Sequence, residues 1–178
     1  MNAAPRLGAL DPAEAPEKSR ELLNDIIGRT GSAGEMISTM AHSPAMLQGY
    51  LDLSRAMKRS KLPRALSEKI SLALQEWIGC GLCLDAHAAG ARAAGLSETD
   101  IALARQGTST DAREAALIAV ATRVLAEPSS LTDEDVAELR AHGWSERIIA
   151  EIPGLVALNL LTGSFNLLAG LKPAEKAT

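Results

Sequence analysis

Aromatic residues are scarce in this sequence. The 178 residues include two tryptophans, one tyrosine and one phenylalanine, which together make up 2% of the chain. Alanine, leucine and isoleucine are plentiful instead, and no segment shows sustained alternation of apolar and polar residues. Small and medium aliphatic side chains suit close contacts between helices better than the faces of a β-sheet. The composition therefore predicts an all-α fold.

A strong excess of charge of either sign is also missing. The formal net charge is -4, and lysines and arginines are scattered among acidic residues, so no basic stripe could hold a phosphate backbone. With so few aromatic side chains there is almost no surface on which bases could stack. These features argue against a nucleic-acid partner. Residues 1–20 lack the pattern of an export or organelle signal, which predicts a cytoplasmic protein.

Long hydrophobic runs are absent except for one. The stretch from Ile152 to Leu171 has no charged residue and is long enough to cross a bilayer. Proline, glycine, asparagine and hydroxyl residues interrupt it, so we predict a helix buried on nearly all sides and no membrane span. A chain this small can scarcely bury such a helix alone, so we expect part of it to pack on another subunit.

The length favours one domain over residues 1–178, and a hydrophobic content of 47% is enough to fill its core. After Pro63, apolar residues recur at helical spacing, and glycines interrupt the pattern on both sides of Cys80. The residues of this apolar stripe are Leu66, Ile70, Ala73, Leu74 and Trp77. A second helix is predicted from Gly81 to Ala94, with Gly95 as its stop. The two helices form a hairpin with the cysteines at its turn.

Capping signals predict the remaining helices. Helices are expected over residues 13–27, near Ile37, after Ser43, after Ser97, after Asp111 with Glu114 completing a capping box, from Thr132 to Gly143, and after Ser145.

Cysteine is rare as well, and both cysteines lie in the stretch CGLCLDAH with one of the three histidines. In a cytoplasmic protein an adjacent thiol pair is more often catalytic or metal-binding than structural. On a helix that begins at Gly81, Cys83 and His87 lie one turn apart on the same face, where they can touch. The helix N-terminus and a basic imidazole both favour the nucleophilic thiolate. Cys80 is placed to form a disulfide with an oxidised Cys83.

Two other interpretations of these residues stay open at this point. Buried cysteines are often small hydrophobic residues and a lone histidine is often part of the core, which would make the chain a binding or assembly module. Cys80, Cys83 and His87 could instead be three zinc ligands, but a closed zinc site usually needs four. The other histidines, His42 and His142, are remote in sequence and resemble surface or capping residues.

A proton relay needs a carboxylate near His87 to fix the tautomer of the imidazole and stabilise its charged form. In an antiparallel hairpin that turns near Gly79, Glu76 lies level with Cys83. Glu68 is offset from His87 by roughly 5 Å, because a helix rises about 1.5 Å per residue. The spacing alone leaves both acids as candidates.

These residues resemble a known pattern. Glu68, eleven residues, Cys80-Gly-Leu-Cys83, three residues and His87 are similar to the Glu-x11-Cys-x-x-Cys-x3-His motif of the AhpD-like alkylhydroperoxidases, within the carboxymuconolactone decarboxylase superfamily. The similarity covers residues 62–170, with residues 1–60 as N-terminal helices. It implies a homo-oligomeric, AhpD-like helical bundle that acts as a thiol peroxidase in antioxidant defence, without a metal, haem or other cofactor.

The resemblance also implies roles for individual residues. Cys83 would attack the hydroperoxide, Cys80 would resolve the product as a disulfide, and His87 with Glu68 would relay protons. A dithiol partner, lipoylated or thioredoxin-like, would reduce the disulfide. Some peroxidases of the family have a second histidine between the cysteines, where this chain has Leu82. Losing a proton-transfer group predicts weak peroxidase activity, which leaves a dithiol-disulfide oxidoreductase as an alternative.

Overall fold

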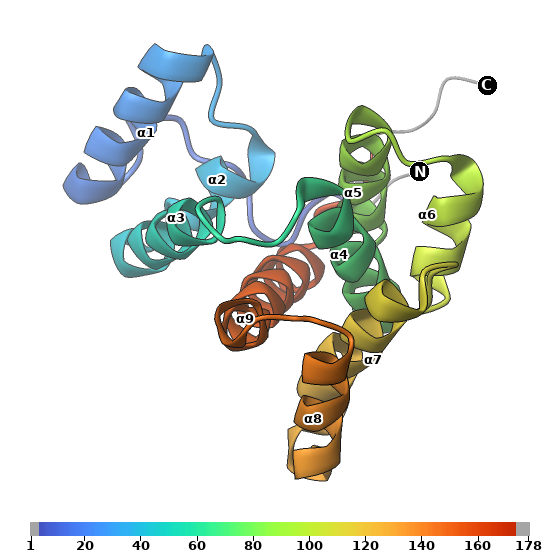
Figure 1. Cartoon of the computed structure of the whole chain (residues 1–178). Coiled ribbons are helices and arrows are strands. Elements are labelled where there is room, and N and C mark those ends of the chain that lie inside the picture. Colours follow the sequence, from blue (N-terminus) through green and yellow to red (C-terminus); the bar gives the residue numbers. More distant parts are fainter. Residues whose placement is uncertain (1–3, 174–178) are drawn as a thin grey trace.

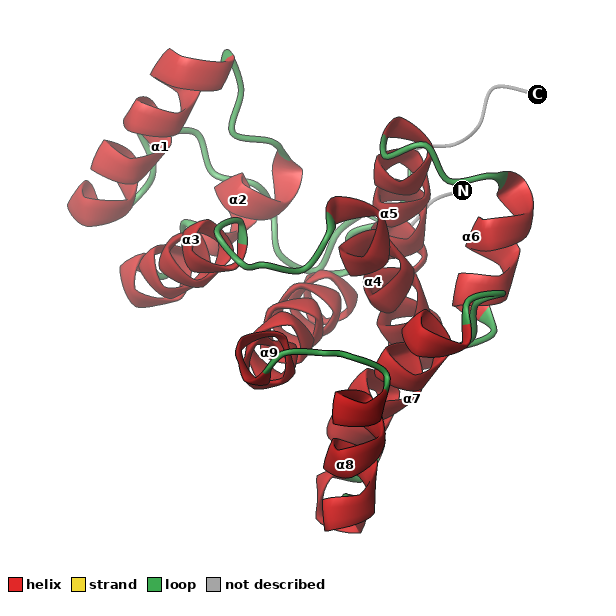
Figure 2. Ribbon diagram, in the orientation of Figure 1, coloured by secondary structure: helices red, strands yellow, loops and turns green. Residues whose placement is uncertain are grey.

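The computed structural model describes residues 4–173 and is all-helical over that range, which confirms the predicted fold class (Figures 1 and 2). The helices are α1 (Glu17–Thr30), α2 (Glu35–Met40), α3 (Pro44–Met57), α4 (Arg64–Ile78), α5 (Gly81–Ala93), α6 (Glu98–Arg105), α7 (Ala112–Ala126), α8 (Asp133–Ala141) and α9 (Glu146–Ala169), with a short 3-10 helix, η1 (Pro128–Ser130), between α7 and α8.

Helix α4 lies at the centre of the fold and packs against α5, α6, α7 and α9 (Figure 1). Residues 69–75 are all buried, so α4 is enclosed on every side over two turns. Ile70 and Leu74 join α7 and α9 in the main hydrophobic cluster, whereas Leu72 packs with Ala91 of α5 and Ile101 of α6. The two helices of the predicted hairpin, α4 and α5, are therefore held by the core.

The N-terminal helices have a hydrophobic cluster of their own. Leu23 of α1, Met40 of α2 and Leu47 of α3 are buried together, and Phe165 of α9 packs against them. Helix α3 also runs beside α9, and Figure 1 shows α1 to α3 grouped on one side of the molecule. Residues before 60 thus attach to the rest of the chain through α9.

Most predicted helix starts are confirmed. Ser43, Ser97, Thr132 and Ser145 are the N-cap residues of α3, α6, α8 and α9. The first helix runs over residues 17–30 and not 13–27, because Pro16 occupies its N-cap position.

The capping box predicted for Asp111 and Glu114 is wrong. Asp111 does cap α7, but the Glu114 carboxylate accepts hydrogen bonds from Lys69 Nζ at 2.7 Å and from Ser109 Oγ at 2.8 Å. Lys69 is only 6% exposed, and a buried ammonium group is costly without a carboxylate partner. The Glu114 side chain therefore pairs with Lys69 and does not take part in capping α7.

Two apolar parts of the chain keep exposed side chains. Trp77 belongs to the apolar stripe of α4, but its side chain is 60% exposed, because it lies in the last turn of α4 beyond the enclosed part. Helix α9 is long and apolar enough to cross a membrane by length and composition, yet only 28% of its most apolar window is buried. Helices α3, α4, α5, α7 and α8 all contact α9, and an exposed stripe remains that includes Leu160, Leu167 and Leu168. Packing of this face on another subunit stays a prediction.

Candidate functional site

The cysteine pair lies at the corner between α4 and α5. Gly79 has a positive φ of 81°, which lets the chain leave α4 and turn into the next helix. Cys80 is the N-cap residue of α5, and its Sγ accepts a hydrogen bond from the Cys83 backbone N–H at 3.3 Å. A disulfide joins Cys80 to Cys83, with a Cα to Cα distance of 5.3 Å. The corner therefore brings the two sulfurs within bonding distance of each other.

The two cysteines differ in what they face. Both are buried, at 1% exposure for Cys80 and 5% for Cys83, but of the two only Cys83 lines the large cavity of the molecule. A molecule that enters this cavity reaches the Cys83 sulfur and not the Cys80 sulfur.

Cys83 also contacts Asn166, a residue that belongs to no motif in the sequence. Asn166 of α9 donates a hydrogen bond from Nδ2 to Cys83 Sγ at 3.3 Å, and its side chain is 3% exposed. The other amide atom, Oδ1, is buried without a hydrogen-bond partner. A donor amide beside a sulfur stabilises negative charge on it. In the sequence, Asn166 differs from its neighbours only as one of the polar residues that interrupt the uncharged run of α9.

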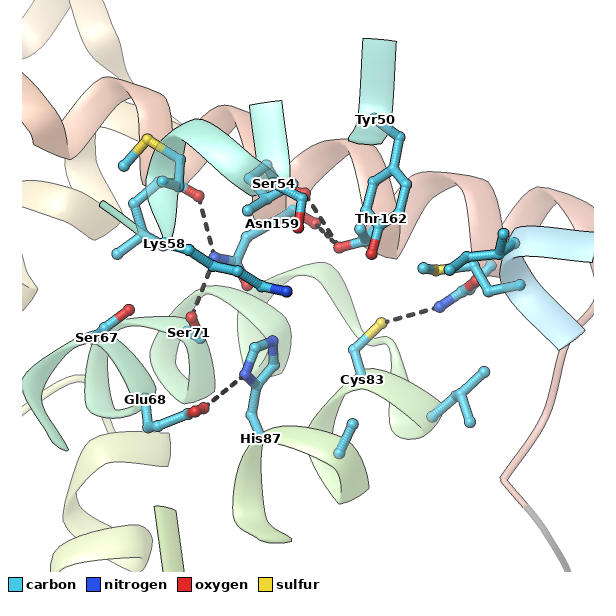
Figure 3. A pocket seen from close by; sticks show the side chains of 18 of the residues that line it. Tyr50, Ser54, Lys58, Ser67, Glu68, Ser71, Cys83, His87, Asn159 and Thr162 are labelled. Atoms are coloured by element: carbon cyan, nitrogen blue, oxygen red, sulfur yellow. Dashed lines mark hydrogen bonds and ion pairs between the residues drawn. The ribbon is translucent and has the colours of Figure 1, made fainter. Parts of the chain in front are cut away.

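His87 and Glu68 are brought together by the packing of α5 on α4. His87 Nδ1 lies 2.8 Å from Glu68 Oε2, and both side chains are partly buried. A carboxylate can only accept, so Nδ1 carries the proton and Nε2 is the nitrogen left to exchange protons. Figure 3 shows this pair together with Cys83. The described residues show no direct hydrogen bond between His87 and the Cys83 sulfur.

Gly90 makes room for Glu68. A Cβ atom placed at Gly90 would lie 2.6 Å from Glu68 Oε1, closer than real Cβ contacts allow. The absence of a side chain at this position in α5 therefore permits the carboxylate to stand beside His87. The alternative acid, Glu76, pairs with Arg105 at 2.7 Å on the surface. Of the two acids left open by the spacing, only Glu68 contacts the imidazole.

A buried polar network ties α4 to α9 behind the site. Asn159 of α9 donates to Ser71 Oγ at 3.1 Å and accepts from Gln75 Nε2 at 2.9 Å. Gln75 is fully buried and also donates to the backbone carbonyl of Asn159. These bonds fix the register of α9 on α4, and the same helix carries Asn166 to Cys83.

The cavity has a volume of about 860 Å³ and is lined by residues of α2, α3, α4, α5 and α9. Cys83 and His87 line it from α5, while Tyr50 and Ser54 line it from α3 (Figure 3). Burial raises the pKa of the Tyr50 phenol, and a hydrogen bond with Ser54 lowers it by less. Tyr50 is therefore a neutral hydrogen-bond donor at physiological pH.

The other two histidines lie away from this site. His42 Nε2 lies 3.0 Å from the backbone oxygen of Gly8, and His142 ends α8 with Glu138 at 3.9 Å. Within residues 4–173 no group of three or more His, Cys, Asp or Glu side chains is arranged to hold a metal ion.

Comparisons with known proteins show what this chain is similar to. Residues 44–127 match the model of the Carboxymuconolactone decarboxylase family, a range that contains Glu68, both cysteines and His87. No significant match was found among curated proteins.

Several crystal structures share the fold over nearly the whole chain. A peroxidase-related protein with an alkylhydroperoxidase AhpD core from Ralstonia eutropha JMP134 superposes with a TM-score of 0.82 at 19% identity, covering 98% of this chain and 95% of the other. A peroxidase-related protein from Silicibacter sp. TM1040 gives a TM-score of 0.79 at 18% identity, covering 98% and 96%.

The debrominase Bmp8, as a cysteine-to-alanine variant in complex with 2,3,4-tribromopyrrole, gives a TM-score of 0.74 at 20% identity, covering 98% of this chain and 94% of the other. A debrominase therefore shares this fold. Over residues 44–127 the chain is thus similar to the carboxymuconolactone decarboxylase family, and it has an AhpD-like helical fold, as the pattern of Glu68, Cys80, Cys83 and His87 predicted.

Proposed function

We propose that this protein is a thiol-dependent hydroperoxide reductase with an antioxidant role. The observation that supports this most is the asymmetry of the cysteine pair: Cys83 faces a large cavity, and Cys80, bonded to it, does not. Such an arrangement suits Cys83 as the peroxidatic thiol, which meets the substrate, and Cys80 as the resolving thiol. The peroxidase-related structures with the same fold are consistent with this assignment.

The reaction balances as two steps. The Cys83 thiolate attacks the terminal oxygen of the hydroperoxide, the O–O bond breaks, and the alkoxide leaves and takes up a proton to become the alcohol. The sulfur is then a sulfenic acid, which the Cys80 thiol attacks to form the disulfide and release water. The sulfur pair is oxidised by two electrons and the peroxide bond is reduced by two.

His87 and Glu68 serve the proton transfers of the first step. His87 Nε2 takes the thiol proton and returns one to the leaving alkoxide, while Glu68 holds the Nδ1 proton and stabilises the charged imidazole. Asn166 supports the same step by donating to the sulfur at 3.3 Å. Because no hydrogen bond links His87 directly to Cys83, we expect the transfer to pass through a water or the substrate itself.

A dithiol partner closes the cycle. One thiolate of the partner attacks the disulfide, its second thiol displaces the mixed disulfide, and both cysteines return to the reduced state. Since Cys83 is reached through the cavity, a lipoyl arm suits this step, and a thioredoxin-like protein is the alternative. We place the protein in the cytoplasm as a homo-oligomer, where the glutathione and thioredoxin systems favour reduced thiols.

The test is a stoichiometric oxidation. Reduced protein is mixed with one equivalent of cumene hydroperoxide, and free thiols, 2-phenyl-2-propanol and disulfide are quantified. We expect the loss of two thiols and the formation of one alcohol per chain. Cys80→Ser should stop at a sulfenic acid that dimedone traps at Cys83. If the wild-type protein keeps both thiols under excess hydroperoxide, the proposal is wrong.

Reductive debromination is a second candidate, supported by the shared fold of the debrominase and its complex with a brominated pyrrole. The same thiol pair would supply two electrons, so that one C–Br bond becomes C–H with release of bromide and formation of the disulfide. Incubation of reduced protein with 2,3,4-tribromopyrrole should then release bromide in step with thiol loss. Thiol loss with hydroperoxide but no bromide would leave only the peroxidase proposal.

A further inference from the structure

The cavity beside Cys83 is far larger than a peroxide group requires. Its volume of about 860 Å³ lies in the range of about 300–1,000 Å³ that encloses drug-sized organic molecules. Hydrogen peroxide, by comparison, has two heavy atoms. Apolar side chains from both sides line the space, among them Met36, Ile37, Met57, Leu82, Leu155 and Leu158. The cavity is therefore suited to a substrate with a sizeable apolar body.

Positive charge is added to this apolar lining by two residues at the N-terminal side. Lys58, directly after α3, and Arg64, at the start of α4, both line the cavity. Within residues 4–173 neither side chain forms an ion pair or a hydrogen bond, in contrast to Lys69, whose charge is paired with Glu114. Figure 3 shows the Lys58 side chain extending into the cavity that His87 also lines. Lys58 thus presents an unpaired cation to whatever occupies the space.

The acidic residues of the lining leave this charge available. Glu68 is hydrogen-bonded to His87 at 2.8 Å. Glu35, at the start of α2, makes no ion pair with either cation. Tyr50 and Ser54, both on α3 as it approaches Lys58, line the same space. Their hydroxyl groups can donate to the oxygens of an anion bound at Lys58.

We propose that the cavity selects organic hydroperoxides that carry a carboxylate, with the carboxylate bound by Lys58 and the apolar body packed between α2, α3 and α9. That the substrate carries a peroxide group rests on the function proposed above. The anion site does not, because the alcohol product keeps the carboxylate and binds without any redox step.

A matched pair of substrates tests the selection. Cumene hydroperoxide and its para-carboxylate, 4-(2-hydroperoxypropan-2-yl)benzoate, differ by one charged group. We expect kcat/KM to be about threefold higher for the carboxylate, mostly through KM, since Lys58 is solvent-exposed and an exposed charge pair contributes only a modest amount. In Lys58→Met this ratio should fall to about one, and in Lys58→Arg, which keeps the charge, it should largely return. Lys61→Met removes an exposed lysine outside the lining and should leave the ratio unchanged.

A binding measurement separates this proposal from the peroxidase assignment. The oxidised protein is titrated calorimetrically with 4-(2-hydroxypropan-2-yl)benzoate and with 2-phenyl-2-propanol, neither of which can react. Tighter binding of the carboxylate, lost in Lys58→Met, supports the anion site even if no hydroperoxide oxidises the thiols. Equal affinities for the two alcohols, or a preference that Lys58→Met leaves intact, would overturn it.

Discussion

The two walls of the cavity are constrained to very different degrees. On the wall formed by α4 and α5, Cys83 is bonded to Cys80, His87 is held by Glu68, and Asn166 of α9 donates to the sulfur. On the wall formed by α2 and α3, Tyr50 and Ser54 hydrogen-bond with each other, but the methionine, isoleucine and lysine side chains have no such partners among the described residues. The difference suggests that reaction geometry is fixed on one wall and substrate choice on the other.

We expect the largest loss of activity from a substitution on the constrained wall, at Cys83. Cys83→Ser replaces the thiolate with a hydroxyl of far higher pKa, and we expect turnover of cumene hydroperoxide with a dithiol reductant to fall by at least about 10³-fold. Peroxide consumption by the purified variant, with near-native helix content by circular dichroism, measures this. Substantial residual turnover would show that Cys83 is not the attacking thiol.

The next effect concerns the carboxylate behind the imidazole. Glu68→Gln removes the charge that stabilises protonated His87 and permits the wrong tautomer, so kcat/KM should fall about 10²-fold. The pH profile of kcat/KM should change with it, which a purely structural role would not produce. Glu76→Gln is the matched control, because Glu76 pairs with Arg105 on the surface. An equal loss in both variants would remove Glu68 from the relay.

Gly90 tests the same pair without changing a charged group. Gly90→Ala brings a methyl group to 2.6 Å from Glu68 Oε1, so the carboxylate must move away from His87 and activity should fall about tenfold. Gly49→Ala in α3 meets nothing within 4 Å and should raise the free energy of unfolding by about 0.5–1 kcal/mol, as glycine to alanine does inside helices. Urea unfolding and turnover, measured on both variants, separate stability from positioning. Full activity in Gly90→Ala would contradict the requirement for contact between Glu68 and His87.

Asn166 is predicted to affect the thiol more than the fold. Asn166→Ala removes the donor to the Cys83 sulfur, and hydrogen bonds to charged groups contribute about 1.5–3 kcal/mol. We expect the rate of alkylation of reduced protein by iodoacetamide at pH 7 to fall by about tenfold, since less thiolate is present. Asn24→Ala, at an exposed position of α1, should keep the wild-type rate. An unchanged rate in Asn166→Ala would leave the amide with a packing role only.

The same contrast explains what could be predicted from the sequence. The hairpin could be predicted because its residues lie within one short stretch, where helical spacing fixes which side chains meet. Spacing could not choose between Glu68 and Glu76, since that choice depends on how α5 rotates against α4. It is decided in the structure by the room that Gly90 provides and by the pairing of Glu76 with Arg105.

The contributions from distant segments could not be predicted. Asn166 is separated from Cys83 by 83 positions, and an asparagine in an apolar helix has no local feature that identifies its partner. The residues of α2 and α3 that line the cavity belong to no motif, because an apolar wall can be built from many combinations of side chains. The exposed stripe of α9 could not be located for a related reason: composition shows that a helix is apolar but not which of its sides the neighbouring helices cover.

We expect the smallest change in activity from a substitution on the wall formed by α2 and α3. Ile37→Ala shortens an apolar side chain on α2 that lines the cavity opposite the hairpin. Each buried methylene contributes about 0.8 kcal/mol, and partial exposure of this lining reduces that value, so the ratio of kcat/KM for cumene hydroperoxide to that for hydrogen peroxide should fall about threefold. Hydrogen peroxide is too small to use the apolar wall and serves as the internal reference. A proportional loss for both substrates would mean that α2 supports the reacting groups as well, and that the two walls do not divide chemistry from selection.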